Sequence, residues 1–331
     1  MKVNHKILAI LAGVMAITTF SCSTLKELGY VPEIKMQSVL PEAIDLEGIT
    51  FECEYSIKNP YPLSFSIQKV SADVVFAESS YIKLSADEGI SVEAMGKRLN
   101  KFRFKVPYET IFKIVRETSG KKTLPFKIAG AAYLDLSSIP LAPSSSMELP
   151  FNVAFDIPVF KPSLALSGFK LQLPGLSELK DGFVKSGKGV TTAVTIAAQV
   201  LSGKALSDSI FDNVDLNVKF LFDLNIADEG SSACNWTIER CCLRSSDGLF
   251  ADAVIGSKKI PAGKSKNQTI PVELTLNTLK SGKLIVQLLN GAGKNPEFLF
   301  DSKLSFPDLN YSGEIPFSYS AEIPLNKISR K

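Results

Sequence analysis

Apolar and polar residues alternate along much of the chain, as they do in strands that bury one face. Gly, Pro and Asn residues separate the alternating runs at short intervals, which is typical of turns between strands. The runs predict strands at 34–40, 48–57 and 64–76 in the first half and at 163–171, 214–225 and 235–243 in the second. Helical spacing of apolar residues replaces the alternation at 108–118 and 276–289, where we expect one amphipathic helix in each half.

The same strand pattern occurs twice. Residues 148–158 contain Glu-Leu-Pro-Phe followed by Asp-Ile-Pro, and residues 314–324 contain Glu-Ile-Pro-Phe followed by Glu-Ile-Pro. Glu314 stands 166 positions after Glu148, and the offset is constant through both segments. A repeat of this length indicates duplicated domains rather than a solenoid. Short strands separated by turns further indicate a β-sandwich in each copy.

The repeat predicts a first domain at 32–160 and a second, more divergent domain at 161–331. The second copy contains an insertion at about 174–212, which we expect to be helical. Its segment 190–201 is apolar on most sides and is flanked by Lys185, Lys188 and Lys204. This segment is too short for a bilayer-spanning helix, which needs about 20 residues. Two interpretations remain open: a helix packed against the sandwich, or a flap or membrane-surface contact.

The N-terminus has the pattern of an export signal. Lys2, His5 and Lys6 precede the uncharged apolar run from Ile7 to Phe20. This run is also shorter than the about 20 residues of a spanning helix. We therefore expect residues 1–21 to be a signal peptide and residues 22–31 to be a tether.

Residues 19–22, Thr-Phe-Ser-Cys, resemble the processing site of bacterial lipoproteins. In that family a small residue precedes a cysteine that is acylated, for example with palmitate. The resemblance implies cleavage after Ser21 and lipid attachment at Cys22, although Thr19 and Phe20 depart from the usual residues. Ordinary cleavage nearby, with loss of Cys22, is the alternative. The lipoprotein interpretation implies a membrane partner and a place in the bacterial cell envelope. No acidic residue follows Cys22 directly, which favours the outer membrane.

Charge and histidine content argue against several functions. The chain has a net charge of +3, and removal of Lys2 and Lys6 with the signal peptide lowers this to +1. A near-neutral chain lacks the basic surface that nucleic acid requires, so we expect no nucleic-acid partner. The single histidine, His5, also leaves with the signal peptide. Since imidazole serves the commonest catalytic triads and zinc sites, we expect no enzyme, no catalytic residue, no metal and no cofactor.

Residues 57–63, Ile-Lys-Asn-Pro-Tyr-Pro-Leu, are followed by an alternating strand at 65–75 and by Ala-Met-Gly-Lys at 94–97. This order resembles the late-embryogenesis-abundant (LEA) type 2 domain, also called the water-stress and hypersensitive-response (WHy) domain. The resemblance implies an immunoglobulin- or fibronectin-like β-sandwich with one helix, and a link to stress protection. The second copy lacks the prolines at the matching position, 223–227.

The motif residues Asn59, Pro60 and Pro62 have a structural explanation of their own. Asn favours turns because its side chain hydrogen-bonds nearby backbone, and Pro ends a strand and fixes φ. We therefore expect a structural corner there rather than a binding site.

Three of the five cysteines lie close together in the second half of the chain, whereas Cys53 lies in the first half. Cys234, Cys241 and Cys242 are either buried thiols or contribute one disulfide, which an exported protein can keep. A strained vicinal Cys241–Cys242 redox pair is the less favoured alternative.

Two functional hypotheses follow. The first is a membrane-anchored binding or structural lipoprotein that holds an apolar lipid ligand or a protein partner. The second is protection against desiccation by a folded LEA type 2-like domain, since the chain lacks the hydrophilic composition of disordered protectants.

Overall fold

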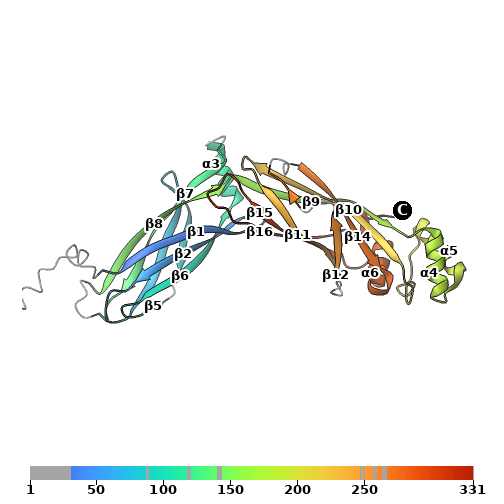
Figure 1. The fold of residues 1–331 in the computed structure, drawn as a ribbon, viewed down its shortest axis with the longest axis horizontal. Helices are drawn as coiled ribbons and strands as arrows, with labels where there is room; N and C mark the ends of the chain where they lie inside the picture. The colour runs from blue at the N-terminus through green and yellow to red at the C-terminus, as the bar shows by residue number, and fades with distance from the viewer. Residues whose placement is uncertain are drawn as a thin grey trace, which may run out of the picture. The chain divides into compact units, whose positions relative to one another are not determined.

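The computed structural model describes residues 31–86, 89–117, 121–139, 144–246, 248, 250–255, 259–262 and 267–330. The protein is mainly β, with 56% of residues in strands and 17% in helices. Its strands form multi-stranded sheets, as expected for β-sandwiches (Figure 1).

Compactness divides the chain into two units. Among the described residues, unit 1 contains those in 31–41, 50–106 and 124–157, and unit 2 contains those in 42–49, 107–123 and 158–330. The domain boundaries 32–160 and 161–331 stay predictions from the repeat. In the structure, two short segments of the first half, 42–49 and 107–123, are grouped with unit 2.

Unit 1 contains two runs of paired strands. One run has the order β4-β3-β7-β8, with β5 also paired to β3, and the other has the order β1-β2-β6. The strands that lie wholly or mostly in unit 1 are β1 (Glu33–Ile44), β2 (Gly48–Lys58), β3 (Phe65–Phe76), β4 (Ser79–Ala86), β5 (Ile90–Val92), β6 (Lys97–Pro107), β7 (Thr123–Asp135) and β8 (Ser146–Pro158).

Aromatic rings fill the core of unit 1. The Phe51 ring centroid lies 5.5 Å from that of Phe104 and 5.1 Å from that of Phe155. Close pairing of β3 with β7 leaves no room for a side chain at Gly130, where a Cβ would lie 2.2 Å from the Ser71 carbonyl oxygen. The alternation along each strand thus directs one face into this core.

Unit 2 also contains two runs of paired strands. One run is β17-β9-β10-β14-β12, and the other contains β11, β15 and β16, with β13 paired to β11. Strand β12 pairs with both β14 and β11, and so joins the two runs. The strands are β9 (Phe160–Gln172), β10 (Asn217–Gly230), β11 (Asn235–Arg244), β12 (Phe250–Ile255), β13 (Lys259–Ile260), β14 (Asn267–Asn277), β15 (Glu297–Ser305), β16 (Ile315–Glu322) and β17 (Ser329–Arg330).

The core of unit 2 is built around Trp236. Its ring centroid lies 5.2 Å from that of Phe317 and 6.2 Å from that of Phe160. Phe317 is the repeat counterpart of Phe151, and both are buried. Edge-to-face and tilted ring pairs of this kind add to the free energy gained from area burial alone.

The α-helices of the described chain all lie in the compact unit 2. They are α3 (Tyr108–Glu117), α4 (Leu176–Lys185), α5 (Gly189–Leu201) and α6 (Thr278–Asn290), and a 3₁₀ turn follows at Leu325–Lys327. Helix α3 comes from the first half of the sequence, but its Tyr108 hydroxyl donates to the Asp45 carbonyl within unit 2, at 3.0 Å. The following segment is held by Ser231 and Ser232, whose hydroxyls donate to the carbonyls of Lys121 and Lys122.

The predicted mainly β fold is confirmed. The strand predicted at 48–57 is β2, and the helix predicted at 108–118 is α3 where the structure describes it. Strand β10 begins three residues later than predicted, at Asn217, because Val214 and Leu216 bond to the start of α6 instead. The helical insertion contains two helices, α4 and α5.

Candidate functional site

The predicted cleavage site Ser21 and lipidation site Cys22 lie outside the described residues, as do the signal peptide 1–21 and most of the tether 22–31. Both sites stay predictions from the sequence. The candidate sites within the described chain are the Asn59 corner, the cysteines, a cavity beside α6 and the surface of α4 and α5.

Asn59 lies at the end of β2 with only 1% of its surface exposed. Its side-chain nitrogen Nδ2 donates to the carbonyl oxygens of Leu63 at 2.8 Å, Val92 at 3.2 Å and Glu93 at 2.9 Å. Its oxygen Oδ1 accepts from the Tyr61 backbone N–H at 2.8 Å. The amide therefore uses its hydrogen-bonding capacity on backbone and holds one corner of unit 1 together.

The same corner brings the two motif segments into contact. The Asn59 N–H donates to the Gly96 carbonyl at 2.8 Å, and the Met95 N–H donates to the Tyr61 carbonyl at 2.8 Å. Pro60 is half-buried and Pro62 is exposed. The 57–63 and 94–97 motifs thus form a single backbone-bonded corner, and none of the polar atoms of the Asn59 amide is left for a ligand.

Cys53, Cys234, Cys241 and Cys242 are all free and buried. The structure therefore contains buried thiols rather than the alternative disulfide among Cys234, Cys241 and Cys242. Cys234 directly precedes β11 and Cys241 lies within it, so their Cα atoms are about 23 Å apart at about 3.3 Å per strand residue. A disulfide needs Cα atoms within about 7 Å. Cys241 and Cys242 are neighbours on one strand and point to opposite faces, so they do not form the vicinal pair.

Burial controls the chemistry of these thiols. It raises the pKa of Cys53 from 9.0 to about 12 and that of Cys241 from 9.0 to about 12. The pKa of Cys234 is also raised, first by burial and then by the charge of Asp228. Since the thiolate is the nucleophile, these cysteines are unreactive at neutral pH.

A cavity of about 500 Å³ opens beside the first turns of α6. Asn277 caps the helix by accepting a hydrogen bond from the Leu279 N–H at 3.0 Å. The helix is interrupted at Ser281, whose φ of −124° and ψ of 18° are not helical. The cavity is lined by residues 278–284 of α6, by residues 211–213 and by Ser245.

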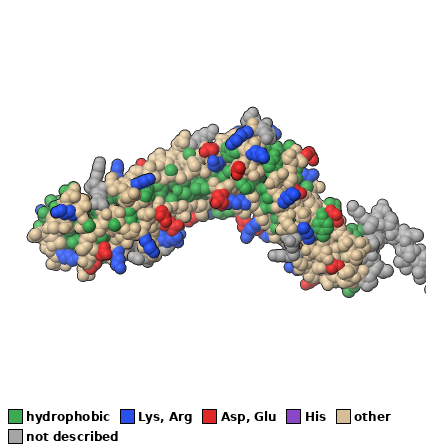
Figure 2. Space-filling model, turned by 180° about the vertical axis from the view of Figure 1, so that it is seen from behind, with side chains coloured by type: hydrophobic (Ala, Val, Ile, Leu, Met, Phe, Trp, Pro, Cys, Tyr) green, Lys and Arg blue, Asp and Glu red, His purple; other side chains and the backbone are tan. Residues whose placement is uncertain are grey.

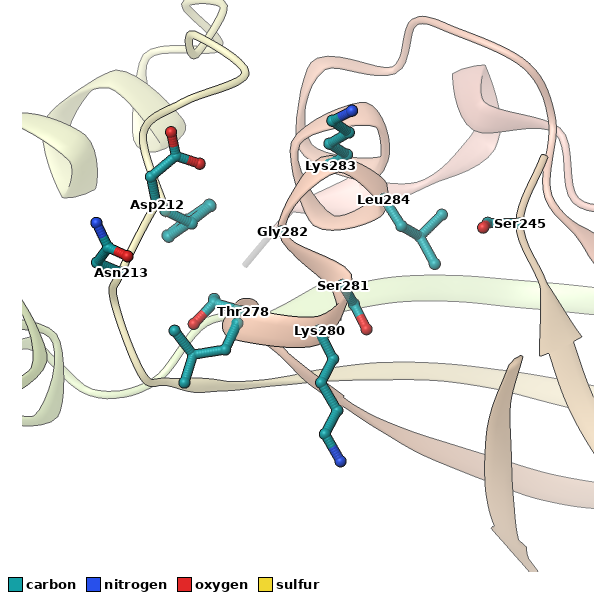
Figure 3. A pocket seen from close by; sticks show the side chains of 11 residues that line it. Asp212, Asn213, Ser245, Thr278, Lys280, Ser281, Gly282, Lys283 and Leu284 are labelled. Carbon is teal, nitrogen blue, oxygen red and sulfur yellow. The ribbon is translucent and has the colours of Figure 1, made fainter. Parts of the chain in front are cut away.

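The groups around this cavity do not converge on one point. Figure 3 shows the Lys280 and Lys283 side chains pointing in opposite directions, with Asp212 and Asn213 on another wall. Thr278 is buried and serves the fold, because its hydroxyl donates to the Val214 carbonyl and accepts from the Leu216 N–H. The arrangement offers neither a paired acid and base nor a cluster of like charges.

The described part of the chain contains no group of three or more His, Cys, Asp or Glu side chains placed to hold a metal ion. Within the same residues, no helix is long and apolar enough to cross a bilayer.

Exposed apolar side chains gather on the insertion. Helices α4 and α5 pack against each other (Figure 1). Helix α5 buries Ala193, Ile196 and Val200 on one side. On a neighbouring face Val190, Val194 and Leu201 are 45%, 46% and 83% exposed. Of the two interpretations from the sequence, burial therefore describes one face of α5, and an adjacent face is apolar and open.

Comparison with known proteins gives structural likenesses alone. No protein-family model matches the chain, and no curated protein matches it at a significant level. It is similar to the solution structure of a late embryogenesis abundant (LEA) protein, with 17% identity over 46% of this chain and 88% of that chain and a TM-score of 0.33. It is similar to a solution structure from Arabidopsis thaliana, with 17% identity over 38% of this chain and 81% of that one and a TM-score of 0.32. A crystal structure from Archaeoglobus fulgidus is similar at 7% identity, over 38% of this chain and 97% of that one, with a TM-score of 0.30.

The hydrogen bonds of Asn59 predict that its replacement destabilises the fold. Asn59→Ala removes this partner from three carbonyls and one N–H, of which the Val92 carbonyl and the Tyr61 N–H are bonded in buried surroundings, so we expect the free energy of unfolding to fall by about 3 kcal/mol. Asn59→Asp keeps the volume but cannot donate, so a comparable loss is expected. Urea unfolding followed by circular dichroism measures both. The exposed Asn326→Ala serves as the control, with a change within about 0.5 kcal/mol. Equal midpoints for all four proteins would contradict the role assigned to Asn59.

The cysteines make a second prediction, tested in a chain with Cys22→Ser. In the folded protein at pH 8 we expect no thiol to react with Ellman's reagent, and in guanidinium we expect all four to react. A disulfide among Cys234, Cys241 and Cys242 would leave only two reactive thiols.

Because the folded pKa of Cys53 lies above its unfolded value, the Cys53 thiol stabilises the fold fully below pH 9.0, and that contribution falls as the pH rises toward about 12.

Proposed function

We propose that the protein is a non-enzymatic binding or structural lipoprotein of the bacterial cell envelope, anchored in the outer membrane by acyl chains on Cys22. The observation that carries this proposal is the place of Cys22, directly after a small residue and at the end of an uncharged apolar run that follows Lys2 and Lys6. Two or three acyl chains provide stable anchoring, where a single chain binds only marginally.

The described chain supports a binding or structural role through its surface. The interiors of both units are filled by aromatic and aliphatic side chains, and the buried amide of Asn59 is committed to backbone. By contrast, Val190, Val194 and Leu201 gather exposed on one helix of the insertion. An apolar lipid or a protein partner is the class of ligand that such a surface takes.

Metabolic labelling with radioactive palmitate tests the anchor. The full chain, produced in a bacterial host, is expected to incorporate label and to sediment with the outer membrane in a density gradient. Cys22→Ser is expected to remove the label and release the protein from the membrane fraction. Ser23→Ala is the matched control and should label normally. Undiminished labelling of the Cys22→Ser protein would disprove acylation at this residue.

Stress protection is the second candidate. It is favoured by the motif at 57–63, whose Asn59 contacts the 94–97 segment through backbone hydrogen bonds in a folded corner. Protection by this chain would come from a folded surface, because mainly β units with closed cores are unlike disordered protectants.

A drying assay tests the second candidate. A labile enzyme is dried and rehydrated with this protein, with an equal mass of albumin, or with the Asn59→Ala variant. Protection should exceed that given by albumin and should fall with the variant at temperatures where it unfolds. Recovery equal to that with albumin rejects stress protection.

A further inference from the structure

One face of helix α5 is apolar and exposed to water. At 100° per residue, Val190, Val194 and Leu201 fall within about 40° of one another on the helix surface. Leu201 is 83% exposed, and Ala198 extends the same stripe. The helix carries no charged residue between Gly189 and Leu201. A solvent-facing helix face is normally polar, so this apolar stripe is better suited to contact with an apolar medium than to contact with water.

The polar side chains of α5 are partly satisfied within the helix itself. The Thr192 hydroxyl donates to the Lys188 carbonyl at 2.7 Å, and the Thr195 hydroxyl donates to the Thr191 carbonyl at 2.9 Å. A hydroxyl that is bonded to its own helix loses little when water is removed. These two threonines therefore do not prevent the exposed side of α5 from entering an apolar medium.

Positive charge borders the apolar stripe at both ends. Between residues 182 and 207 the charged residues are Lys185, Lys188 and Lys204, with no Asp or Glu. Lys185 and Lys204 are exposed. Lys188 is half-buried, and its Nζ donates to the carbonyls of Ser209 at 3.1 Å and Ile210 at 3.0 Å. The acidic residues of the insertion lie outside this stretch, at Glu178 and Asp181 in α4 and at Asp208 and Asp212 after α5.

We infer that the exposed face of α5 docks onto an anionic lipid surface, with Val190, Val194 and Leu201 in the headgroup–acyl boundary and the lysines against the headgroups. An uncharged apolar helix face bordered by lysines is the pattern of interfacial helices. The far-left end of the view in Figure 2, where α4 and α5 lie, shows hydrophobic and basic side chains at the surface.

Charge argues against a second copy of this chain as the occupant. In an antiparallel pairing of two α5 helices, Lys188 of one copy would face Lys204 of the other, and in a parallel pairing each lysine would face itself. Both arrangements place like charges opposite one another. An anionic lipid surface instead neutralises the lysines at both ends of the helix.

A small apolar ligand fits the helix less well than a lipid surface does. A cavity of about 400 Å³ borders the end of α5 and includes Val200 and Leu201, together with Asn290 and Leu325. Val190 and Val194 lie outside it. A ligand in that cavity would leave most of the apolar stripe uncovered.

This inference deepens the proposed membrane function by naming a second lipid contact, and it is tested without the first. The chain from residue 22 to 331 with Cys22→Ser keeps every described residue and carries no acyl chain. Its binding is measured by co-sedimentation with phosphatidylcholine vesicles and with vesicles of equal parts phosphatidylcholine and phosphatidylglycerol. We expect binding to the anionic vesicles, weaker binding to the neutral ones, and a loss of binding in high salt.

Two paired sets of variants locate the contact. Val194→Ser with Leu201→Ser is expected to weaken anionic-vesicle binding by roughly tenfold or more. Val254→Ser with Leu279→Ser, which are 71% and 57% exposed elsewhere in unit 2, should leave it unchanged. Lys185→Gln with Lys204→Gln is expected to weaken it by roughly 25-fold, at about fivefold per lysine. Lys280→Gln with Lys283→Gln, beside the α6 cavity, is the matched charge control.

Circular dichroism and thermal unfolding confirm that each variant is folded, which is expected because the changed side chains are exposed. Absence of vesicle binding by the parent chain overturns the inference. So does equal binding by the α5 variants and their controls. Sedimentation that shows a dimer lost in Val194→Ser with Leu201→Ser, without vesicle binding, would assign the face to self-association instead. A failure of palmitate labelling at Cys22 is read separately and leaves these outcomes unaffected.

Discussion

Aromatic rings packed between paired strands are the interaction on which both units depend. Phe51 packs against Phe104 and Phe155 in unit 1, and Trp236 packs against Phe300 and Phe317 in unit 2. Each such pair contributes about 0.5–1.5 kcal/mol beyond the burial of its area. A shift of one residue in strand register would turn these rings toward solvent, so the register of every core strand is strongly specified.

A polar group inside a closed core is costly unless it is hydrogen-bonded, and Asn59 and Thr278 both bond to the backbone. Asn59 in unit 1 meets this condition with three donated hydrogen bonds and one accepted bond. Thr278 in unit 2 meets it by bonding to Val214 and Leu216. Buried cysteines behave as small apolar side chains, since their raised pKa keeps them protonated. Asn59, Thr278 and the buried cysteines are thereby explained by folding rather than by chemistry.

The surface of the insertion differs from that of the sandwich strands. The exposed residues of the sandwich strands are largely polar or charged, for example Lys219 and Glu273, which form an ion pair across β10 and β14 at 2.8 Å. Helix α5 has no charged residue and leaves Val194 and Leu201 in the open. Exposure of that kind has a free-energy cost in water, which a helix would avoid if its sole role were to cover α4.

The sequence by itself determined the β-rich character, the repeat and the buried positions that the repeat shares. Leu149 and Ile315, like Phe151 and Phe317, are buried because alternation with a period of two places them on the core face of any sheet. It also predicted a corner at Asn59, since Asn-Pro favours a turn by local bonding alone. These features depend on near neighbours along the chain, which the sequence states directly.

Tertiary structure decided the rest, because it depends on residues far apart in sequence. The partners of Asn59 near residues 92–96 stand more than 30 positions away and are set by the packing of unit 1. Extended geometry along β11 separated Cys234 from Cys241 and thereby removed a disulfide that spacing alone allowed. Packing likewise selected which face of α5 is buried. The sequence shows a helix that is apolar on most sides. Only the packing of α5 against α4 and the rest of the fold makes Ile196 buried and Leu201 exposed.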